Sequence, residues 1–302
     1  MKLNEWIYKS KNIFTHSDLQ FLLRQFFCDK DIFQKQNSIS LDKVRLESLD
    51  KTKKEYKKGV PLAYLLGKEE FFGLEFNVNP AVLIPRQDTE VITEKAIEII
   101  RNNNLIEMLD LCCGAANIAI TIKKFFKDKI KVWASDISAK AIAVARSNTR
   151  RHKVKVSLRK GNLFSHTRGK KFDIIVSNPP YVGKPEIKGS LKYEPRIALE
   201  AGNDGMYFIE KIIKNAHSYL KEKGFLIIEA GYKHKKPINS ILEKTGKYEI
   251  IEYIRDYGGN FRGVILRNRS GYPRSKTRID ASELPCVNPR RYPRQSASKT
   301  KL

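Results

Sequence analysis

Residues 177–181 (Ser-Asn-Pro-Pro-Tyr) combine an amide side chain, two prolines and an aromatic ring. They follow residues 172–176 (Phe-Asp-Ile-Ile-Val), a short β-branched run that predicts a buried strand. Because two prolines cannot continue a sheet ladder, the backbone must leave the sheet at Asn178 in an extended form. The Asn178 side chain, the Pro179 carbonyl and the Tyr181 ring then lie at the carboxyl end of a strand, where open α/β sheets bind ligands. We interpret this run as part of a functional site; a rigid strand exit is the simpler alternative.

A second candidate is the turn at residues 110–116 (Asp-Leu-Cys-Cys-Gly-Ala-Ala), between a predicted strand and a predicted helix. Its small residues allow the backbone to approach a ligand, and they leave the N–H groups of the helix N-terminus free to meet it. The run is not a Gly-x-Gly-x-x-Gly fingerprint. No Gly-Lys-Ser/Thr follows it, which excludes a phosphate-binding P-loop.

Two further predicted strand ends carry polar residues. Asp136 follows the next strand, and an acidic residue about twenty positions after such a turn can bind ribose hydroxyls. Alternatively, Asp136 caps the following helix, a role that Ser138 fills equally well. Asn162 and Leu163 follow a third strand and offer an amide and an apolar surface suited to an adenine ring. Together these strand ends indicate a site for a nucleoside-bearing cofactor.

The elements that must position these residues alternate between strand and helix. We predict strands at residues 105–112, 130–135, 154–158, 172–176 and 225–229, and helices at 91–100, 116–126, 139–151, 206–220 and 236–245. Thr89 or Asp88 is the expected cap of the first of these helices. Residues 248–255 and 263–267 resemble a closing antiparallel pair. This alternation predicts an α/β fold with a doubly wound, mostly parallel sheet.

The chain divides by composition into four segments. Residues 1–60 predict short amphipathic helices, one at 19–27 capped by Ser17 or Thr15 and one at 41–56. Residues 61–84 predict a linker with a β-hairpin around Gly73 and Leu74. Residues 85–268 hold the α/β domain, and the basic tail at 269–302 lacks apolar periodicity and is expected to be disordered.

The composition narrows the class of protein. The net charge of +25 over 302 residues suggests a polyanionic neighbour such as RNA or the ribosome, although scattered lysines also arise from a general compositional bias. No apolar run approaches the ~20 residues of a membrane span, and residues 1–6 do not begin a secretory signal. The four cysteines lack metal-site spacing, so we expect no metal, no disulfide framework and a cytoplasmic location.

The order of these elements resembles the class I S-adenosylmethionine-dependent methyltransferases and, within them, the HemK/PrmC family. That family methylates the side-chain amide nitrogen of the glutamine in the GGQ motif of peptide chain release factors. The resemblance runs from about residue 61 to 266. It rests on residues 61–67 (Pro-Leu-Ala-Tyr-Leu-Leu-Gly), 70–73 (Glu-Phe-Phe-Gly), 83–86 (Leu-Ile-Pro-Arg), 89–90 (Thr-Glu), 178–182 (Asn-Pro-Pro-Tyr-Val), 193–195 (Tyr-Glu-Pro), 198–199 (Ala-Leu), 204–205 (Asp-Gly) and 255–257 (Arg-Asp-Tyr).

The resemblance implies S-adenosylmethionine as cofactor, release factors as partners and a role for each site residue. The Asn178 side-chain oxygen and the Pro179 carbonyl would accept the two amide hydrogens of the substrate glutamine, with Pro180 and Tyr181 completing the substrate site. Asp110 would hold the methionine ammonium, Asp136 the ribose and Asn162 the adenine. The remaining expected cofactor contacts are Cys112, Gly114, Ala116 and Leu163.

Four positions depart from the family pattern. Cys112 and Ala116 stand where the family usually has glycine, Asn162 where aspartate is common and Gln87 where proline is usual. A nucleic-acid methyltransferase acting on the exocyclic amines of rRNA or DNA is the main alternative, because the same residues suit any planar exocyclic nitrogen. A ribosome-associated binding protein that has lost its cofactor is the other. We expect a monomeric enzyme acting on release factors, since the motifs at 61–73 and 83–90 are specific to that family.

Overall fold

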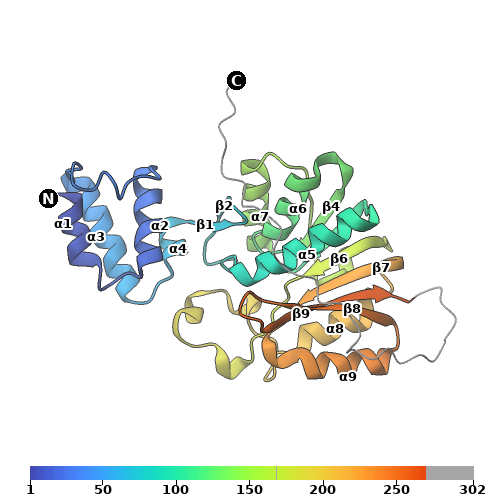
Figure 1. Ribbon diagram of the computed structural model, residues 1–302. Helices are drawn as coiled ribbons and strands as arrows, with labels where there is room; N and C mark the ends of the chain where they lie inside the picture. The colour runs from blue at the N-terminus through green and yellow to red at the C-terminus, as the bar shows by residue number, and fades with distance from the viewer. Residues whose placement is uncertain (168, 270–302) are drawn as a thin grey trace. The chain divides into compact units, whose positions relative to one another are not determined.

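The computed structural model describes residues 1–167 and 169–269, and seven strands of this part form one sheet (Figure 1). The strand order is β5-β4-β3-β6-β7-β9-β8. Their bounds are β3 Glu107–Leu111, β4 Lys131–Asp136, β5 Ser157–Lys160, β6 Phe172–Ser177, β7 Leu220–Glu229, β8 Tyr248–Arg255 and β9 Phe261–Asn268. Strands β3 to β7 pair in parallel, and β9 pairs antiparallel with both β7 and β8. The predicted α/β fold with a doubly wound, mostly parallel sheet is confirmed.

Helices cover both faces of this sheet (Figure 1). The helices α5 (Gln87–Asn103), α6 (Asn117–Phe126) and α7 (Ala139–Arg151) pack on one face, and α8 (Tyr207–Ala216) and α9 (Lys235–Thr245) pack on the other. Neighbouring residues of β3 divide between the two layers, since Met108 belongs to the first core and Leu109 to the second. Both faces of the central strands are therefore buried, which explains their continuous apolar runs.

The strand order changes direction between β3 and β6. The chain passes from β3 outward to β4 and β5, and then returns to place β6 on the other side of β3. Ligands of doubly wound sheets bind at this switch point, outside the carboxyl ends of the strands. The turn at 110–116 and the run at 177–181 follow these two strands, so the topology brings the two candidate sites together.

Several predicted boundaries are wrong. Helix α5 begins four residues before the predicted start, with Arg86 at its N-cap, so Asp88 and Thr89 lie in its first turn and do not cap it. The predicted helix 206–220 ends at Ala216 because β7 already begins at Leu220, and β5 begins at Ser157, where pairing with Trp133 of β4 starts. The shifts at β5 and β7 come from strand pairing, which local propensity does not encode.

The N-terminal helices share a hydrophobic core of their own. They are α1 (Leu3–Ser10), α2 (His16–Phe27) and α3 (Lys43–Lys57), packed around buried residues that include Trp6, Leu22 and Leu49. The Thr15 hydroxyl accepts from the Asp18 N–H at 3.1 Å, which confirms one of the two predicted caps.

The short helix α4 (Leu62–Leu66) and the hairpin β1 (Lys68–Phe71) and β2 (Leu74–Asn77) follow, and this hairpin was predicted. Short 3-10 helices span Lys127–Lys129, Leu163–His166, Lys184–Glu186, Gly189–Tyr193, Arg196–Ala198 and Tyr232–His234. Within residues 1–167 and 169–269, no helix has the length and apolar character needed to cross a membrane. The expected disorder of the tail concerns residues 270–302, which lie outside the described residues.

Candidate active site

A cavity of about 190 Å³ lies at the carboxyl ends of β3, β4 and β6. Eight of the eleven predicted site residues line it: Asp110, Cys112, Gly114, Asp136, Asn162, Leu163, Asn178 and Pro180. Ala116, Pro179 and Tyr181 are not among the lining residues. Sequence reasoning did not identify Arg86, Thr89, Ile197 and Phe208, which also line the cavity. The topology therefore brings most of the predicted site residues to the lining of one cavity.

The turn after β3 has an unusual backbone. Cys112, Gly114 and Ala116 all have positive φ, at 63°, 51° and 61°. Glycine adopts this left-handed region without strain, whereas a residue with a Cβ pays roughly 1–2 kcal/mol. The backbone thus explains why the family pattern places glycine at the positions of Cys112 and Ala116. This chain adopts the turn with the small side chains of Cys112 and Ala116 instead of glycine.

Asp110 is the penultimate residue of β3, and its carboxyl group is buried. Its Oδ2 accepts from the Ala119 N–H of α6 at 3.0 Å, while its buried Oδ1 has no hydrogen-bond partner in the described part of the chain. Burial, with a smaller contribution from the nearby Asp136 charge, raises the pKa of Asp110 to about 7. A cationic group next to Oδ1 would give this atom a hydrogen-bond partner and favour the ionised form of Asp110.

Asp136 ends β4 and organises the same turn. Its Oδ2 accepts from the Gly114 N–H at 3.0 Å and its Oδ1 from the Ser138 N–H at 2.8 Å. Ser138, and not Asp136, caps α7, because its hydroxyl accepts from the Ala141 N–H at 3.2 Å. Burial raises the pKa of Asp136, and the hydrogen bonds from Ser138 and Gly114 oppose that effect. Asp136 is thus free of the helix-cap role that was its simplest alternative.

Asn178 follows β6 and is held by α5. Its side-chain Nδ2 donates to the Thr89 hydroxyl at 3.0 Å. No hydrogen bond to its Oδ1 occurs among the residues that the structure describes. The bond to Thr89 therefore leaves the carbonyl end of the amide as an acceptor in a side chain that lines the cavity.

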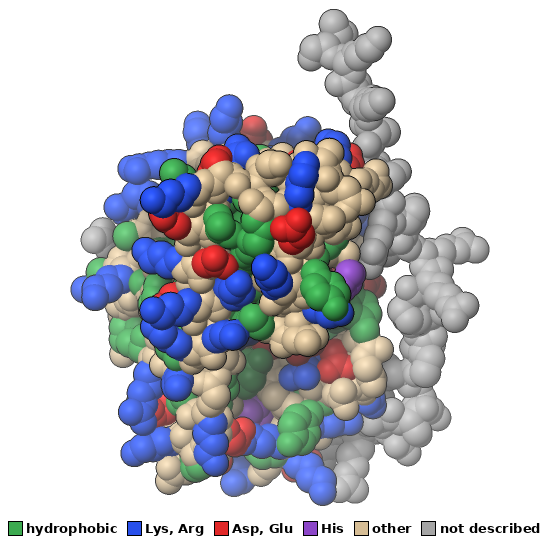
Figure 2. Space-filling model, turned by 90° about the vertical axis from the view of Figure 1, so that its left-hand side faces the viewer, with side chains coloured by type: hydrophobic (Ala, Val, Ile, Leu, Met, Phe, Trp, Pro, Cys, Tyr) green, Lys and Arg blue, Asp and Glu red, His purple; other side chains and the backbone are tan. Residues whose placement is uncertain are grey.

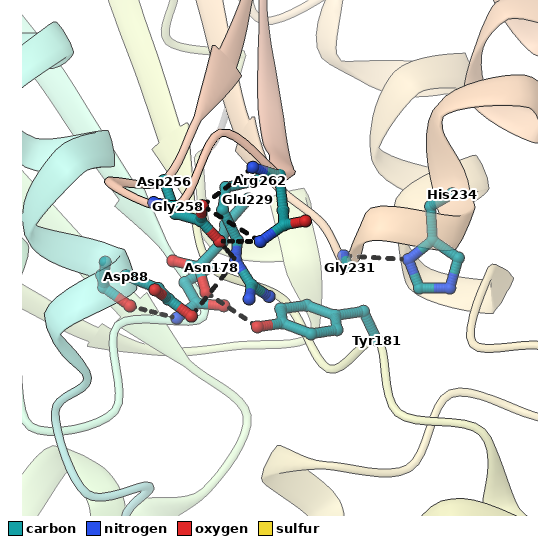
Figure 3. A network of polar contacts seen from close by, with 11 residues as sticks. Asp88, Asn178, Tyr181, Glu229, Gly231, His234, Asp256, Gly258 and Arg262 are labelled. Atoms are coloured by element: carbon teal, nitrogen blue, oxygen red, sulfur yellow. Dashed lines mark hydrogen bonds and ion pairs between the residues drawn. The ribbon is translucent and has the colours of Figure 1, made fainter.

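Tyr181 is turned away from the cavity, toward the interior. Its hydroxyl donates to Oε1 of Glu229, the last residue of β7, at 2.9 Å, and its ring packs edge-on against His234 (Figure 3). Gly205 lies beside it at φ 81°, where an added Cβ would stand 2.2 Å from the Tyr181 carbonyl oxygen and 2.9 Å from His234 Nε2. Only glycine fits at this contact, which fixes the chain after the two prolines.

An ion pair lies at the edge of the cavity that Arg86 lines. Arg86, which lines the cavity, donates to Glu194, and Glu194 also accepts from the Ile84 N–H at 3.1 Å. A second ion pair joins Asp88 of α5 to Arg262 of β9 at 3.2 Å, and Arg262 also contacts Asp256 at 3.0 Å (Figure 3). Sequence patterns named Arg86, Glu194 and Asp256 only as parts of motifs, without showing that Arg86 pairs with Glu194 or that Asp256 pairs with Arg262.

Two observations test whether these residues fit S-adenosylmethionine. At Gly114 nothing lies within 4 Å of the position that a Cβ would occupy, so the turn leaves open space for a ligand against its backbone. At Asp110 the buried, unpaired Oδ1 is an acceptor for the ammonium of a methionine group. A ribose and a purine have partners in Asp136 and Asn162, which line the same cavity. The donor set therefore fits this cofactor.

Comparisons with known proteins identify relatives of the chain. The family model "Methyltransferase small domain" matches residues 89–194. A release factor glutamine methyltransferase of Fusobacterium nucleatum is 39% identical over 220 residues, which span 70% of this chain but only 61% of that protein. The one from Buchnera aphidicola is 35% identical over 280 residues, covering 88% of this chain and 98% of its own length.

A solved structure shares the fold. The hMettl16 catalytic domain, determined in complex with MAT2A 3′UTR hairpin 1, superposes with a TM-score of 0.53 at 16% identity, over 70% of this chain and 79% of that one. At this identity the likeness concerns the fold alone. The Buchnera relative, by contrast, is aligned over nearly its whole length at 35% identity. The chain therefore belongs to the release factor glutamine methyltransferase family.

Proposed function

We propose that this protein transfers a methyl group from S-adenosylmethionine to the side-chain amide nitrogen of the glutamine in the GGQ motif of peptide chain release factors. The observation that carries the proposal is the hydrogen bond from Asn178 Nδ2 to Thr89 at 3.0 Å. It presents Asn178 Oδ1 as an acceptor, which is the group needed to bind an amide N–H of the substrate. Membership of the release factor glutamine methyltransferase family supports the choice of substrate.

The chemistry required of the protein is to orient a weak nucleophile. An amide nitrogen reacts poorly because its lone pair is delocalised into the carbonyl. Asn178 Oδ1 and the Pro179 carbonyl would accept its two hydrogens, which holds the nitrogen in line for transfer and favours the positive charge that develops on it. When bound, S-adenosylmethionine supplies a methyl group on a sulfonium. The amide proton leaves after transfer, so the site needs no strong base.

The helices of residues 1–60 are proposed to recognise the release factor, with residues 61–84 as linker and 85–268 as catalytic domain. The helices α1 to α3 support this division, because they bury their own apolar residues around Trp6. The Tyr193 hydroxyl donates to the Lys58 carbonyl at 2.7 Å, which joins the end of α3 to the segment that contains Glu194. Recognition by the helices would thereby be connected to a wall of the cavity.

The positive charge of the surface is consistent with polyanionic surroundings. Figure 2 shows Lys and Arg side chains spread over the face turned to the viewer, with fewer acidic side chains among them. The net charge of +25 favours approach to RNA-rich surfaces and, through self-repulsion, a monomer. A monomer that works in the cytoplasm near terminating ribosomes fits this charge.

The test is a direct choice between substrates. The protein is incubated with methyl-labelled S-adenosylmethionine and either a release factor, the same release factor with its GGQ glutamine replaced by alanine, or ribosomal RNA. We expect label only in the unmodified release factor, located by mass spectrometry on that glutamine. Label in the RNA alone would overturn the proposal in favour of a nucleic-acid methyltransferase.

A further inference from the structure

The positive charge of the chain is concentrated in one segment. Residues 117–172 hold 16 Lys and Arg residues but only two acidic residues, Asp128 and Asp136, so this segment carries +14 of the net charge of +25. Residues 1–116 hold 17 basic and 17 acidic residues and are neutral. A general enrichment in lysine raises the basic count throughout a chain and does not remove the carboxylates from one part of it. The charge of residues 117–172 therefore needs an explanation of its own.

The fold brings the two connecting turns of this segment to one edge of the sheet. Strands β4 and β5 are parallel neighbours, and β5 is the edge strand. The turn from α6 into β4 and the turn from α7 into β5 therefore both lie at the amino ends of these strands, and α6 and α7 lie side by side (Figure 1). Lys123 fixes the first turn, because its ammonium donates to the carbonyls of Lys127 at 2.7 Å and Ile130 at 2.9 Å.

Six exposed lysines belong to the end of α6 and to these two turns, and we call them the basic patch: Lys124, Lys127, Lys129, Lys131, Lys153 and Lys155. None of the six forms an ion pair with another residue that the structure describes, whereas Lys123 beside them pairs with Asp128 at 3.4 Å. Lys131 and Lys155 stand at matching positions, since each lies two residues before a member of the Trp133–Ser157 pair of β4 and β5. Like charges held together without counter-ions favour the approach of a polyanion.

The composition of the basic patch fits phosphate groups better than it fits a protein or a membrane. Protein interfaces and membrane-bound helices use exposed apolar anchors. The exposed aromatic at the margin of the patch is Phe125, and the Arg101 guanidinium lies over its ring at 5.1 Å. Phosphate contacts, by contrast, are made by Lys and Arg side chains and need no apolar surface.

We propose that the basic patch binds the phosphate backbone of RNA without reading its sequence. The patch lies at the amino ends of β4 and β5, whereas the cavity lies at the carboxyl ends, and the six residues of β4 separate the two by roughly 20 Å. RNA bound at the patch leaves the cavity open, so its role is to hold the enzyme on RNA and not to present a base for methylation. Binding of a nucleic acid goes beyond the proposed function, and the choice of RNA over DNA rests on that function.

The first experiment compares two triple variants of equal net charge. Lys124→Gln, Lys129→Gln and Lys155→Gln together remove three charges from the patch, one each from α6, from the 3-10 helix that follows it and from the turn before β5. The matched control combines Lys236→Gln, Lys244→Gln and Lys247→Gln, which remove three exposed charges from α9 and the loop after it, on the opposite face of the sheet. Both variants keep the full chain, so the basic residues at 270–302 contribute equally to each.

The measurement is the affinity for an RNA duplex of about 20 base pairs, followed by fluorescence anisotropy at several salt concentrations. The patch variant should bind about tenfold or more weakly than the unmodified protein at low salt. The slope of log K against log salt should fall by about 2–3, because each lost phosphate contact removes roughly 0.9 from it. The control variant should lose less than about threefold in affinity. Equal losses in the two variants, or no loss in the patch variant, would overturn the proposal.

Competing ligands test the class of partner. Poly-glutamate represents an acidic protein, and vesicles of phosphatidylserine represent a membrane. At equal salt both should bind more weakly than the RNA duplex, and tighter binding of either one contradicts the assignment to RNA. A DNA duplex of the same sequence that binds more tightly than the RNA contradicts the choice between the two nucleic acids.

Methyl transfer separates this proposal from the proposed function. The patch variant should keep the melting temperature of the unmodified protein and methylate a free release factor at the same rate, since the substituted side chains are exposed and lie outside the cavity. A protein that binds RNA through the patch but leaves the release factor unmodified contradicts the proposed function and keeps the role of the patch. A protein that methylates the release factor but binds RNA equally well in both triple variants contradicts the role of the patch alone.

Discussion

The Arg86 guanidinium donates to the Glu194 carboxylate, which lies 108 residues further along the chain. The Glu194 side chain is 1% exposed and also accepts from the Ile84 N–H at 3.1 Å, so it joins the loop before α5 to the segment after β6. Arg86 from that loop and Thr89 from the first turn of α5 line the cavity together with Ile197 and Ala198 from the later segment. One buried carboxylate therefore holds two walls of the proposed site in register.

Removing the arginine should destabilise the protein. Arg86→Ala leaves the Glu194 carboxylate buried with only the Ile84 N–H, and we expect a loss of about 2–4 kcal/mol of unfolding free energy in urea. The control is Arg196→Ala, which breaks an ion pair with Glu200 in which the arginine side chain is 65% exposed. That variant should cost less than about 1 kcal/mol. Equal losses in the two variants would show that the buried pair has no special role.

Asp110 should make both stability and cofactor binding depend on pH. Its pKa is about 7 in the folded protein, whereas an aspartate in the unfolded chain titrates near 4. The folded state thus holds a proton that the unfolded state has lost. The stabilising contribution of Asp110 is therefore complete below about pH 4 and disappears as the pH rises to 7. Asp110→Asn should gain stability relative to the unmodified protein over this interval, as measured by urea unfolding.

The same carboxyl should release a proton when the cofactor binds. The ammonium of S-adenosylmethionine next to Oδ1 favours the ionised form, so at pH 6.5 binding should release a large part of one proton. Calorimetry in buffers of different ionisation enthalpy measures this number directly. Asp110→Asn should abolish the release. Proton release that persists in Asp110→Asn would assign it to another group, such as Asp136.

The sequence predicted a doubly wound sheet with a site at its strand ends, but not the residues that support that site. The run Asn-Pro-Pro-Tyr predicted the exit from β6, and β4 and α7 lie where the hydrophobic periodicity placed them, because these are local properties of the chain. The contact of Thr89 with Asn178 joins residues 89 positions apart, and Thr89 was expected to cap a helix. A single threonine or glutamate in the sequence does not indicate a distant hydrogen-bond partner. An acidic residue at the end of a buried strand, such as Glu229, does indicate that a polar partner is needed there.

Ala116, one of the two residues that stand where the family usually has glycine, allows a test of backbone strain. Ala116 is fully buried with φ 61°, whereas its neighbour Ala115, also buried, is not in the left-handed region. Ala116→Gly relieves strain of roughly 1 kcal/mol, which offsets the entropy that glycine adds to the unfolded chain, so it should be nearly neutral. Ala115→Gly relieves no strain and should cost about 1 kcal/mol. If urea unfolding gives the same loss for both, the positive φ of Ala116 stores no strain.

Asn178→Asp separates the two ends of the Asn178 side chain. The variant keeps an oxygen acceptor and nearly the same shape, but it loses the NH₂ group that donates to Thr89. It also adds a negative charge, which can strengthen binding of the sulfonium in the ground state without helping the transition state. The rate of methyl transfer should fall by about a hundredfold or more, while calorimetry with S-adenosylmethionine shows an unchanged or higher affinity. Asn178→Ala, which removes both ends, should likewise bind the cofactor and leave the release factor glutamine unmodified by mass spectrometry. Because both variants should keep the melting temperature of the parent, full activity in Asn178→Ala would refute the role of this residue in orienting the substrate amide.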